Sequence, residues 1–172
     1  TIKPRLYQQV IFGTALKNDT LVVLPTGLGK TAIALMLAAK RLDNYPKSKI
    51  VMMAPTKPLC EQHLVSFEEE LDEPAVLLTG SISPDKRAKL WSENRIIVST
   101  PQTLENDIIS SRIDLNDVSL MIFDEAHRAT GDYAYSFVAK QYKKRAKYER
   151  ILALTASPGS DMESIKEVMK NL

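Results

Sequence analysis

Residues 21–31, LVVLPTGLGKT, are the most informative stretch of the sequence. They begin with an apolar run that predicts a buried strand, which Pro25 and Gly27 interrupt. Lys30 and Thr31 then open AIALMLAA, a run rich in helix formers. A strand, a glycine loop and a helix N-terminus bind phosphate, because glycines admit backbone N–H groups to the oxygens and the helix end carries partial positive charge. Lys30 is placed to reach the β- and γ-phosphates, and the Thr31 hydroxyl to bind Mg²⁺.

One position departs from the generic phosphate-loop pattern, because Leu24 stands where that pattern has its first glycine. An ordinary strand–turn–helix that happens to contain Gly29-Lys30-Thr31 is the competing interpretation. The apolar run before the loop and the helix formers after it favour phosphate binding. We therefore expect a nucleotide to contact the whole loop: Pro25, Thr26, Gly27, Leu28, Gly29, Lys30 and Thr31.

Composition indicates one globular domain, because 172 residues, 44% of them hydrophobic and 26% charged, can bury a substantial core. The net charge of +2 gives no strong indication about nucleic acid. Cys60 is the only cysteine, which excludes an internal disulfide and fits a reducing cytosol. No apolar run approaches the roughly 20 residues of a membrane span, and no signal-like segment follows Thr1. We expect a cytoplasmic protein or an excised part of one.

Apolar runs alternate with helix-forming segments along the chain. The expected strands cover residues 21–24, 50–54, 75–78, 95–98, 118–123 and 150–154. The expected helices cover residues 4–18, 30–42, 59–71, 84–91, 101–110, 133–148 and 161–171. Because the strands are continuously apolar, this alternation predicts an α/β fold with a mainly parallel sheet and helices on both faces. The polar motifs all follow strands, so we expect them to meet at the carboxyl edge of the sheet.

A second motif, Asp124-Glu125-Ala126-His127, follows the apolar run 118–123. At the end of a strand, Asp124 can hold Mg²⁺ directly or through water, and Glu125 is placed to orient an attacking water. The alternative is a cluster of acids that caps a helix N-terminus. The phosphate loop ~95 residues upstream, in a sheet of matching design, favours the metal-binding interpretation.

Successive segments resemble the motifs of superfamily-two helicases: residues 5–8, 25–31, 54–58, 99–102, 124–127 and 154–157. The loop form PTGLGKT is the helicase variant of the phosphate loop. The stretches APTKPL, VSTPQTLENDI, DEAHRATGDYAY and LALTASPGS are most similar to the Hef group of archaeal helicase–nucleases. That group is related to the Fanconi anaemia M protein and, through its nuclease half, to XPF. The resemblance runs from Pro4 to the final expected helix.

This resemblance implies that residues 1–172 form a RecA-like P-loop NTPase domain, the first of two, which binds ATP and Mg²⁺. The implied catalytic residues are Lys30, Asp124, Glu125 and His127. The implied metal contacts are Thr31 and Asp124. Arg5 and Gln8 are the implied nucleotide contacts ahead of the loop, and Gln8 suits adenine because its amide can donate to N7 and accept from N6.

The resemblance also implies contacts to a nucleic-acid backbone. The residues are Thr56, Lys57, Thr79, Gly80, Ser99, Thr100, Pro101 and Gln102. Hydroxyls and backbone N–H groups commonly contact phosphates without reading sequence. The prolines have the alternative role of simple helix-start residues: Pro55, Pro58 and Pro101. Thr155 and Ser157, with His127, would couple the two sites, although many relatives carry S-A-T where this chain has T-A-S.

Other features receive no site role. His63 is expected on a helix surface and Trp91 in packing, while Leu6 and Val10 share a face of the first helix. A basic run is interpreted as a solvated helix end rather than a DNA patch. Its members are Lys140, Lys143, Lys144, Arg145 and Lys147.

The function implied by the resemblance is ATP-driven remodelling of branched or forked DNA. A second RecA-like domain and a nuclease domain are the expected partners, and an archaeal protein of this kind would associate with the nucleoid. The alternatives are a double-stranded-RNA-dependent ATPase of the Dicer and RNA-sensor type and a nucleotide-binding module without turnover. Lys30, Asp124 and Glu125 together favour turnover. Because the second domain would supply the arginine finger, this chain alone is expected to hydrolyse ATP very slowly.

Overall fold

The computed structural model describes residues 5–24, 29–126 and 133–156. Its elements are α1 (Leu6–Lys17), β1 (Thr20–Val23), α2 (Lys30–Asn44), β2 (Lys49–Met53), α3 (Lys57–Glu70), β3 (Ala75–Leu78), α4 (Pro84–Glu93), β4 (Ile96–Ser99), α5 (Pro101–Ile109), β5 (Val118–Phe123), α6 (Tyr133–Arg145) and β6 (Ile151–Thr155). Their ends lie within one helical turn of the expected ends. The helix expected over residues 161–171 lies outside the described residues. None of the described helices is long and apolar enough to cross a membrane.

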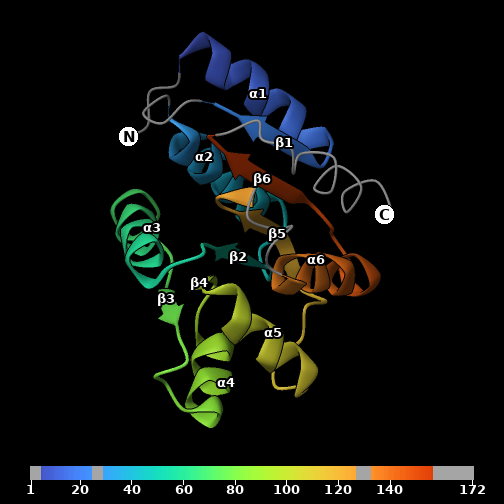
Figure 1. Cartoon of the computed structure of the whole chain (residues 1–172). Coiled ribbons are helices and arrows are strands. Elements are labelled where there is room, and N and C mark those ends of the chain that lie inside the picture. The colour runs from blue at the N-terminus through green and yellow to red at the C-terminus, as the bar shows by residue number, and fades with distance from the viewer. Residues whose placement is uncertain (1–4, 25–28, 127–132, 157–172) are drawn as a thin grey trace.

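The strands form one sheet with the order β1-β6-β5-β2-β4-β3 (Figure 1). Every neighbouring pair is parallel, which confirms the sheet predicted from the apolar runs. After β1 the chain passes over two positions, which β5 and β6 fill later, so segments far apart in sequence become neighbours. The carboxyl ends of the strands therefore share one edge.

Side chains of each strand alternate between two hydrophobic clusters, one on each face of the sheet. In β2, Ile50 and Met52 pack into the cluster that contains residues of α1, α2 and α3. Val51 and Met53 pack into the other cluster, which contains residues of α4, α5 and α6. The predicted coverage of both faces is thus confirmed. Trp91 packs into the second cluster as expected, being only 5% exposed.

The first helix buries a face other than the apolar one that Leu6 and Val10 share. Leu6 and Val10 are 77% and 64% exposed, so their common face does not pack against the sheet. The helix buries Gln8 and Ala15 instead, with Ile11 partly buried beside them. Residues two positions apart lie on roughly opposite sides of an α-helix. Turning the Gln8 amide inward to its polar partners therefore turns Leu6 and Val10 to the surface.

Candidate functional site

The sheet order sorts the predicted motifs into two groups at the carboxyl edge. β1, β6 and β5 are neighbours and lead into the phosphate loop, Thr155 and Asp124, and we call this group the phosphate-loop half. β2, β4 and β3 lead into segments rich in threonine and serine, and we call this group the hydroxyl half. The two halves meet where β5 pairs with β2.

Gln8 joins α1 to the end of the phosphate loop. Its Nε2 donates to the Gly29 carbonyl at 3.2 Å, and its Oε1 accepts from the Arg5 backbone N–H at 2.9 Å. Gly29 has φ +80°, and a Cβ added there would overlap the Gln8 amide. Only glycine fits this position without strain, because the left-handed region and the close approach both exclude a side chain. The structure thus brings Gln8 to the loop, whereas its contact with adenine stays a prediction.

Lys30 opens α2, and its Nζ donates to the Leu24 carbonyl at 3.0 Å. Residues 25–28 of the loop, between these two groups in sequence, lie outside the described part of the chain. The N-cap of α2 is Gly29, which has no side chain to accept from the first N–H groups of this 15-residue helix. Such a helix end suits phosphate, and Thr31 stands half-buried in its first turn.

Asp124, the first acid after β5, is only 7% exposed and is held by three elements. Its N–H donates to the Met53 carbonyl of β2 at 2.9 Å, and its carbonyl accepts from the Tyr135 hydroxyl of α6 at 2.7 Å. Its Oδ2 lies 2.7 Å from Nε2 of His63 in α3. The backbone and the carboxylate of Asp124 are therefore fixed by separate partners.

His63 is a residue that the sequence interpretation missed. It is 8% exposed, so the expectation of a surface histidine is wrong. The buried residues of α3 are Cys60, His63 and Phe67. Their spacing of three and four is that of one helix face, and this periodicity was the signal available in the sequence.

The donor groups near the end of β5 suit a Mg²⁺ ion that a nucleotide brings with it. The described residues contain no cluster of three or more His, Cys, Asp or Glu that could hold a metal ion alone. Mg²⁺ rarely uses such a cage, and usually takes one or two carboxylates together with water and substrate phosphates. A single oriented carboxylate such as Asp124, close to a phosphate loop in the sheet order, therefore fits Mg²⁺ that arrives with a nucleotide.

Glu125 follows with φ 55°, in the left-handed region that a residue with a side chain adopts at a cost of ~1–2 kcal/mol. Backbone strain of this kind concentrates at functional sites. Its role in orienting water stays a prediction. The predicted coupling residue Thr155 is 1% exposed at the end of β6, while His127 and Ser157 lie outside the described residues.

In the hydroxyl half, the predicted contact residues form bonds within their own loops. Thr56 caps α3, accepting from the Leu59 N–H at 3.4 Å. The hydroxyls of Thr79 and Ser81 lie 2.8 Å apart, and those of Thr100 and Thr103 lie 2.9 Å apart. These bonds fix the loops where α3, α4 and α5 begin.

The predicted nucleic-acid residues differ in how accessible they are. Lys57, Gly80 and Gln102 are exposed. Ser99 is 1% exposed and its hydroxyl donates to the Thr100 carbonyl at 2.9 Å, so a direct phosphate contact from this hydroxyl does not fit the structure. Pro101 is buried in the first turn of α5, where it acts as the helix-start residue considered above.

The basic run at the end of α6 is partly internal. Lys143 forms an ion pair with Asp19 at 2.8 Å and lies 3.6 Å from Glu149, so the expectation of a wholly solvated helix end is wrong for this lysine. The other members of the run are exposed, as expected: Lys140, Lys144, Arg145 and Lys147. Burial and a hydrogen bond with Asp19 raise the pKa of Glu149 to about 8.

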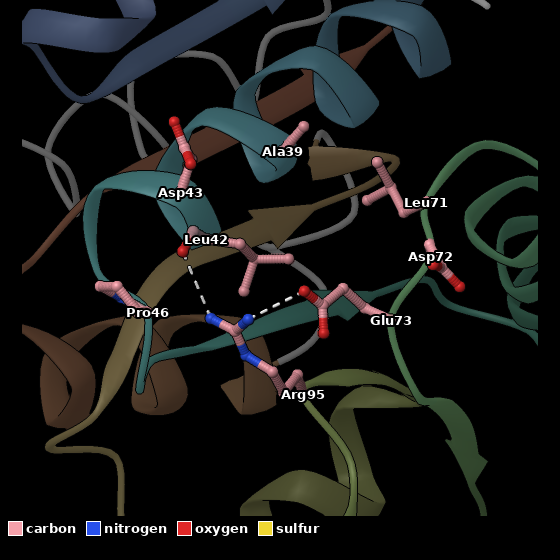
Figure 2. A pocket seen from close by; sticks show the side chains of 8 residues that line it. All are labelled: Ala39, Leu42, Asp43, Pro46, Leu71, Asp72, Glu73 and Arg95. Carbon is pink, nitrogen blue, oxygen red and sulfur yellow. Dashed lines mark hydrogen bonds and ion pairs between the residues drawn. The ribbon is translucent and has the colours of Figure 1, made fainter.

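A shallow hollow of about 390 Å³ lies at the amino end of the sheet, away from all the motifs (Figure 2). Arg95 crosses it and pairs with Glu73 at 2.9 Å. The guanidinium also donates to the Leu42 carbonyl at 3.4 Å, which ties α2 to the start of β4. The Arg95 guanidinium is thus paired within the protein, and we assign this hollow a structural role.

Comparisons with known proteins agree with this arrangement. A family profile described as DEAD/DEAH box helicase matches residues 5–165. The chain is 47% identical to "Putative ATP-dependent RNA helicase MJ1505" of Methanocaldococcus jannaschii, over 100% of this chain and 22% of that protein. It is 43% identical to "DEAD-box ATP-dependent DNA helicase Fancm" of Drosophila melanogaster, over 98% of this chain and 12% of that protein. The chain thus spans less than a quarter of these relatives.

The crystal structure of the Pyrococcus furiosus Hef helicase domain matches with a TM-score of 0.90 and 52% identity. The match covers 98% of this chain and 36% of that one. It confirms the RecA-like fold and the resemblance to Hef. With the matched profile and the sequence relatives, it leads to one assignment: this chain belongs to the DEAD/DEAH box helicase family.

Proposed function

We propose that this chain is the ATP-binding motor domain of a DNA helicase or translocase that acts on branched or forked DNA. The observation that carries the proposal is the sheet order. Only β6 lies between β1 and β5 of the phosphate-loop half, and the strands of the hydroxyl half follow next to β5. A Drosophila relative is named a DNA helicase, and the matched structure is the helicase domain of Hef. ATP hydrolysis in one half would then drive DNA remodelling through the other.

ATP and Mg²⁺ are the proposed ligands of the phosphate-loop half. Lys30 would exchange the Leu24 carbonyl for a phosphate oxygen, beside the N–H groups of the α2 N-terminus. Asp124 and Thr31 would hold the metal, which supplies positive charge next to the phosphates. Glu125 would orient the attacking water, and Gln8 would read adenine.

The DNA backbone is the proposed ligand of the hydroxyl half. Since α3 and α5 begin directly after β2 and β4, their N-termini lie at the carboxyl edge, where phosphates can bind them. Lys57 and Gln102 add exposed polar side chains. Such contacts do not read base sequence. Affinity should therefore fall steeply with salt and lie in the ~10⁻⁴–10⁻⁶ M range of non-specific binding.

A second RecA-like domain and a nuclease domain are proposed as further parts of the working protein, because the chain spans only 12–36% of the relatives compared above. The second domain would supply an arginine to the γ-phosphate, a contribution worth on the order of 10³–10⁵ in rate. Without that arginine, this chain alone should turn over ATP very slowly. We propose a cytoplasmic or nucleoid-associated location for the whole protein.

A double-stranded-RNA-dependent ATPase is the second candidate. The Methanocaldococcus relative, 47% identical, is named a putative RNA helicase, and backbone contacts alone do not separate DNA from RNA. Steady-state ATPase of the full-length protein with branched DNA and with double-stranded RNA compares the candidates. Stronger stimulation by RNA would overturn the DNA assignment, and absence of turnover with either would favour a binding module.

The phosphate site is tested by titration calorimetry with Mg²⁺-ATP and Mg²⁺-GTP. Lys30→Ala should weaken ATP binding by roughly 1.5–3 kcal/mol, the value of a lost charge-assisted hydrogen bond. Lys40→Ala is the control, since this lysine is exposed near the other end of α2. Unchanged affinity in Lys30→Ala would refute the phosphate-loop interpretation, and equal ATP and GTP affinities would refute adenine recognition by Gln8.

A further inference from the structure

His63 links the two halves of the carboxyl edge through one hydrogen bond. It lies in the second turn of α3, the helix that starts just beyond β2, and its Nε2 is 2.7 Å from Oδ2 of Asp124. The two side chains are 10% and 11% exposed, so water competes little for either group. The partners are 61 residues apart in sequence, and no motif described above includes His63.

The direction of this bond follows from the chemistry of its two groups. An ionised carboxylate only accepts, so Nε2 of His63 donates to Oδ2, and a neutral imidazole is sufficient. Met53 and Tyr135 already fix the backbone of Asp124 on both sides of its Cα. Rotation of the Asp124 side chain is the freedom that is left, and the bond from His63 removes it.

We propose that His63 is a positioning residue that sets the rotamer of Asp124 so that its carboxylate meets the Mg²⁺ of a bound nucleotide. This inference rests on the proposed function, because it requires Asp124 to be a metal contact. Residues that orient a metal-binding group from the outer shell typically contribute roughly 10–100-fold to metal affinity.

The same bond connects α3, which starts in the hydroxyl half, to the carboxylate proposed to bind the metal. α3 begins at Thr56 and Lys57, in a loop proposed to grip the DNA backbone, and it carries His63 roughly 9 Å further along its axis. A helix moves as a rigid element over this distance. Displacement of α3 on DNA binding would therefore shift the donor against the Asp124 carboxylate and change metal affinity.

Three variants of His63 separate a positioning role from a purely structural one, because they differ in whether a donor still reaches Asp124. In His63→Gln the amide nitrogen takes the place of Nε2 and still donates to Asp124. In His63→Asn the shorter amide reaches only the place of Nδ1. Both variants bury a neutral amide, so they are matched controls for one another. His63→Leu removes the donor and keeps apolar packing beside Cys60 and Phe67.

The test measures Mn²⁺ binding to the ATP-loaded protein by electron paramagnetic resonance, ATP affinity in EDTA by calorimetry, and the thermal unfolding midpoint. We expect Mn²⁺ affinity to fall roughly tenfold in His63→Asn and His63→Leu, and to stay within about threefold of the parent in His63→Gln. ATP affinity in EDTA should not change in any of the three, since His63 does not face the phosphates in this proposal.

Equal Mn²⁺ losses in all three variants would overturn the inference, and so would losses that follow the unfolding midpoint. Asp124→Asn separates this inference from the proposed function. If Asp124→Asn leaves Mn²⁺ affinity unchanged, the proposed metal site itself fails. If Asp124→Asn abolishes Mn²⁺ binding while His63→Asn and His63→Leu do not weaken it, the inference about His63 alone fails.

Discussion

The two halves of the carboxyl edge differ in where the partners of their polar side chains come from. In the phosphate-loop half, Gln8 bonds Gly29 from 21 residues away, and Asp124 bonds His63 from 61 residues away. In the hydroxyl half, three threonines each find a partner within three residues: Thr56, Thr79 and Thr100. These motif residues of the first half are thus held by contacts between elements, and the three threonines of the second by contacts within their own loops.

This difference has a physical consequence for how each half acquires its shape. Long-range bonds form only after the intervening chain has been ordered, so their geometry depends on the packing of the whole sheet. Bonds between residues three apart form whenever the local turn forms. We therefore expect substitutions at the motif residues of the phosphate-loop half to act across elements, and those at the loop threonines of the hydroxyl half to stay local.

The largest effect is expected where the hydroxyl half has a long-range contact of its own, beneath its loops. Arg87 of α4 binds Asp107 of α5 through two bonds of 2.9 and 2.8 Å, with both residues at most 5% exposed. Arg87→Met leaves the buried Asp107 carboxylate unpaired, so unfolding free energy from urea denaturation should fall by ~3–5 kcal/mol. The double variant Arg87→Met/Asp107→Leu should recover most of this loss. A single variant as stable as the parent would contradict the prediction.

The next effect contrasts two glycines, one from each half. Gly29→Ala forces a left-handed residue with a side chain, which costs ~1–2 kcal/mol, and also displaces the Gln8 amide. Gly80→Ala meets nothing within 4 Å and is the matched control. Thermal unfolding and ATP calorimetry should show losses for Gly29→Ala alone. Similar losses in Gly80→Ala would remove the contrast between the halves.

A pH effect is expected at the opposite edge of the sheet, where Asp19 and Glu149 meet just before β1 and β6 begin. Burial and Asp19 raise the pKa of Glu149 from 4.5 to about 8, so between these values the folded state holds a proton that the unfolded state has lost. The contribution of this group to the free energy of unfolding is fully present below pH 4.5 and is lost as pH rises through 8. Glu149→Gln should therefore gain on the order of 1 kcal/mol over the parent between pH 6 and 9.

Urea denaturation at both pH values measures this gain. The control is Glu93→Gln, because Glu93 is exposed and pairs with Lys89 at 3.9 Å. If the difference in unfolding free energy between the parent and Glu149→Gln is the same at pH 6 and pH 9, the Glu149 carboxyl does not titrate in this range.

The smallest effect is expected from a local cap in the hydroxyl half. Thr56→Val removes the acceptor for the Leu59 N–H at the start of α3, at a cost of ~0.5–1 kcal/mol. Mg²⁺-ATP affinity should stay unchanged, because no bond to the nucleotide site passes through this hydroxyl. Calorimetry on Thr56→Val gives the answer, and a loss of ATP affinity as large as that of Gly29→Ala would argue against local behaviour.

Several features could be predicted because they depend only on residues that are close together in the sequence. Continuously apolar runs gave the strands within a residue or two, and the run 118–123 matches β5 at both ends. The prolines at the starts of α3, α4 and α5 marked helix N-termini, because proline lacks only an N–H that is unpaired there. The phosphate loop and Asp124 were placed at strand ends for the same local reasons.

The sequence left open, or in the case of His63 predicted wrongly, which way some side chains face. Leu6 and Val10 are apolar, yet they lie at the surface because Gln8 takes the buried side of α1. His63 is polar, yet it is buried because Asp124 offers it a partner. A polar residue moves inward when its hydrogen bonds are satisfied there, and that condition depends on residues far away in the sequence.

The amino-acid sequence alone was enough to predict a parallel α/β sheet, a glycine loop before a helix and an acidic motif after a strand, because each depends on periodicity or spacing over a few residues. The strand order β1-β6-β5-β2-β4-β3 and the bond from His63 to Asp124 emerged from the assembled structure. Apolar strands of similar length can pair in many orders, and in the order adopted helices cover both faces of the sheet. A contact across 61 residues exists only in that arrangement.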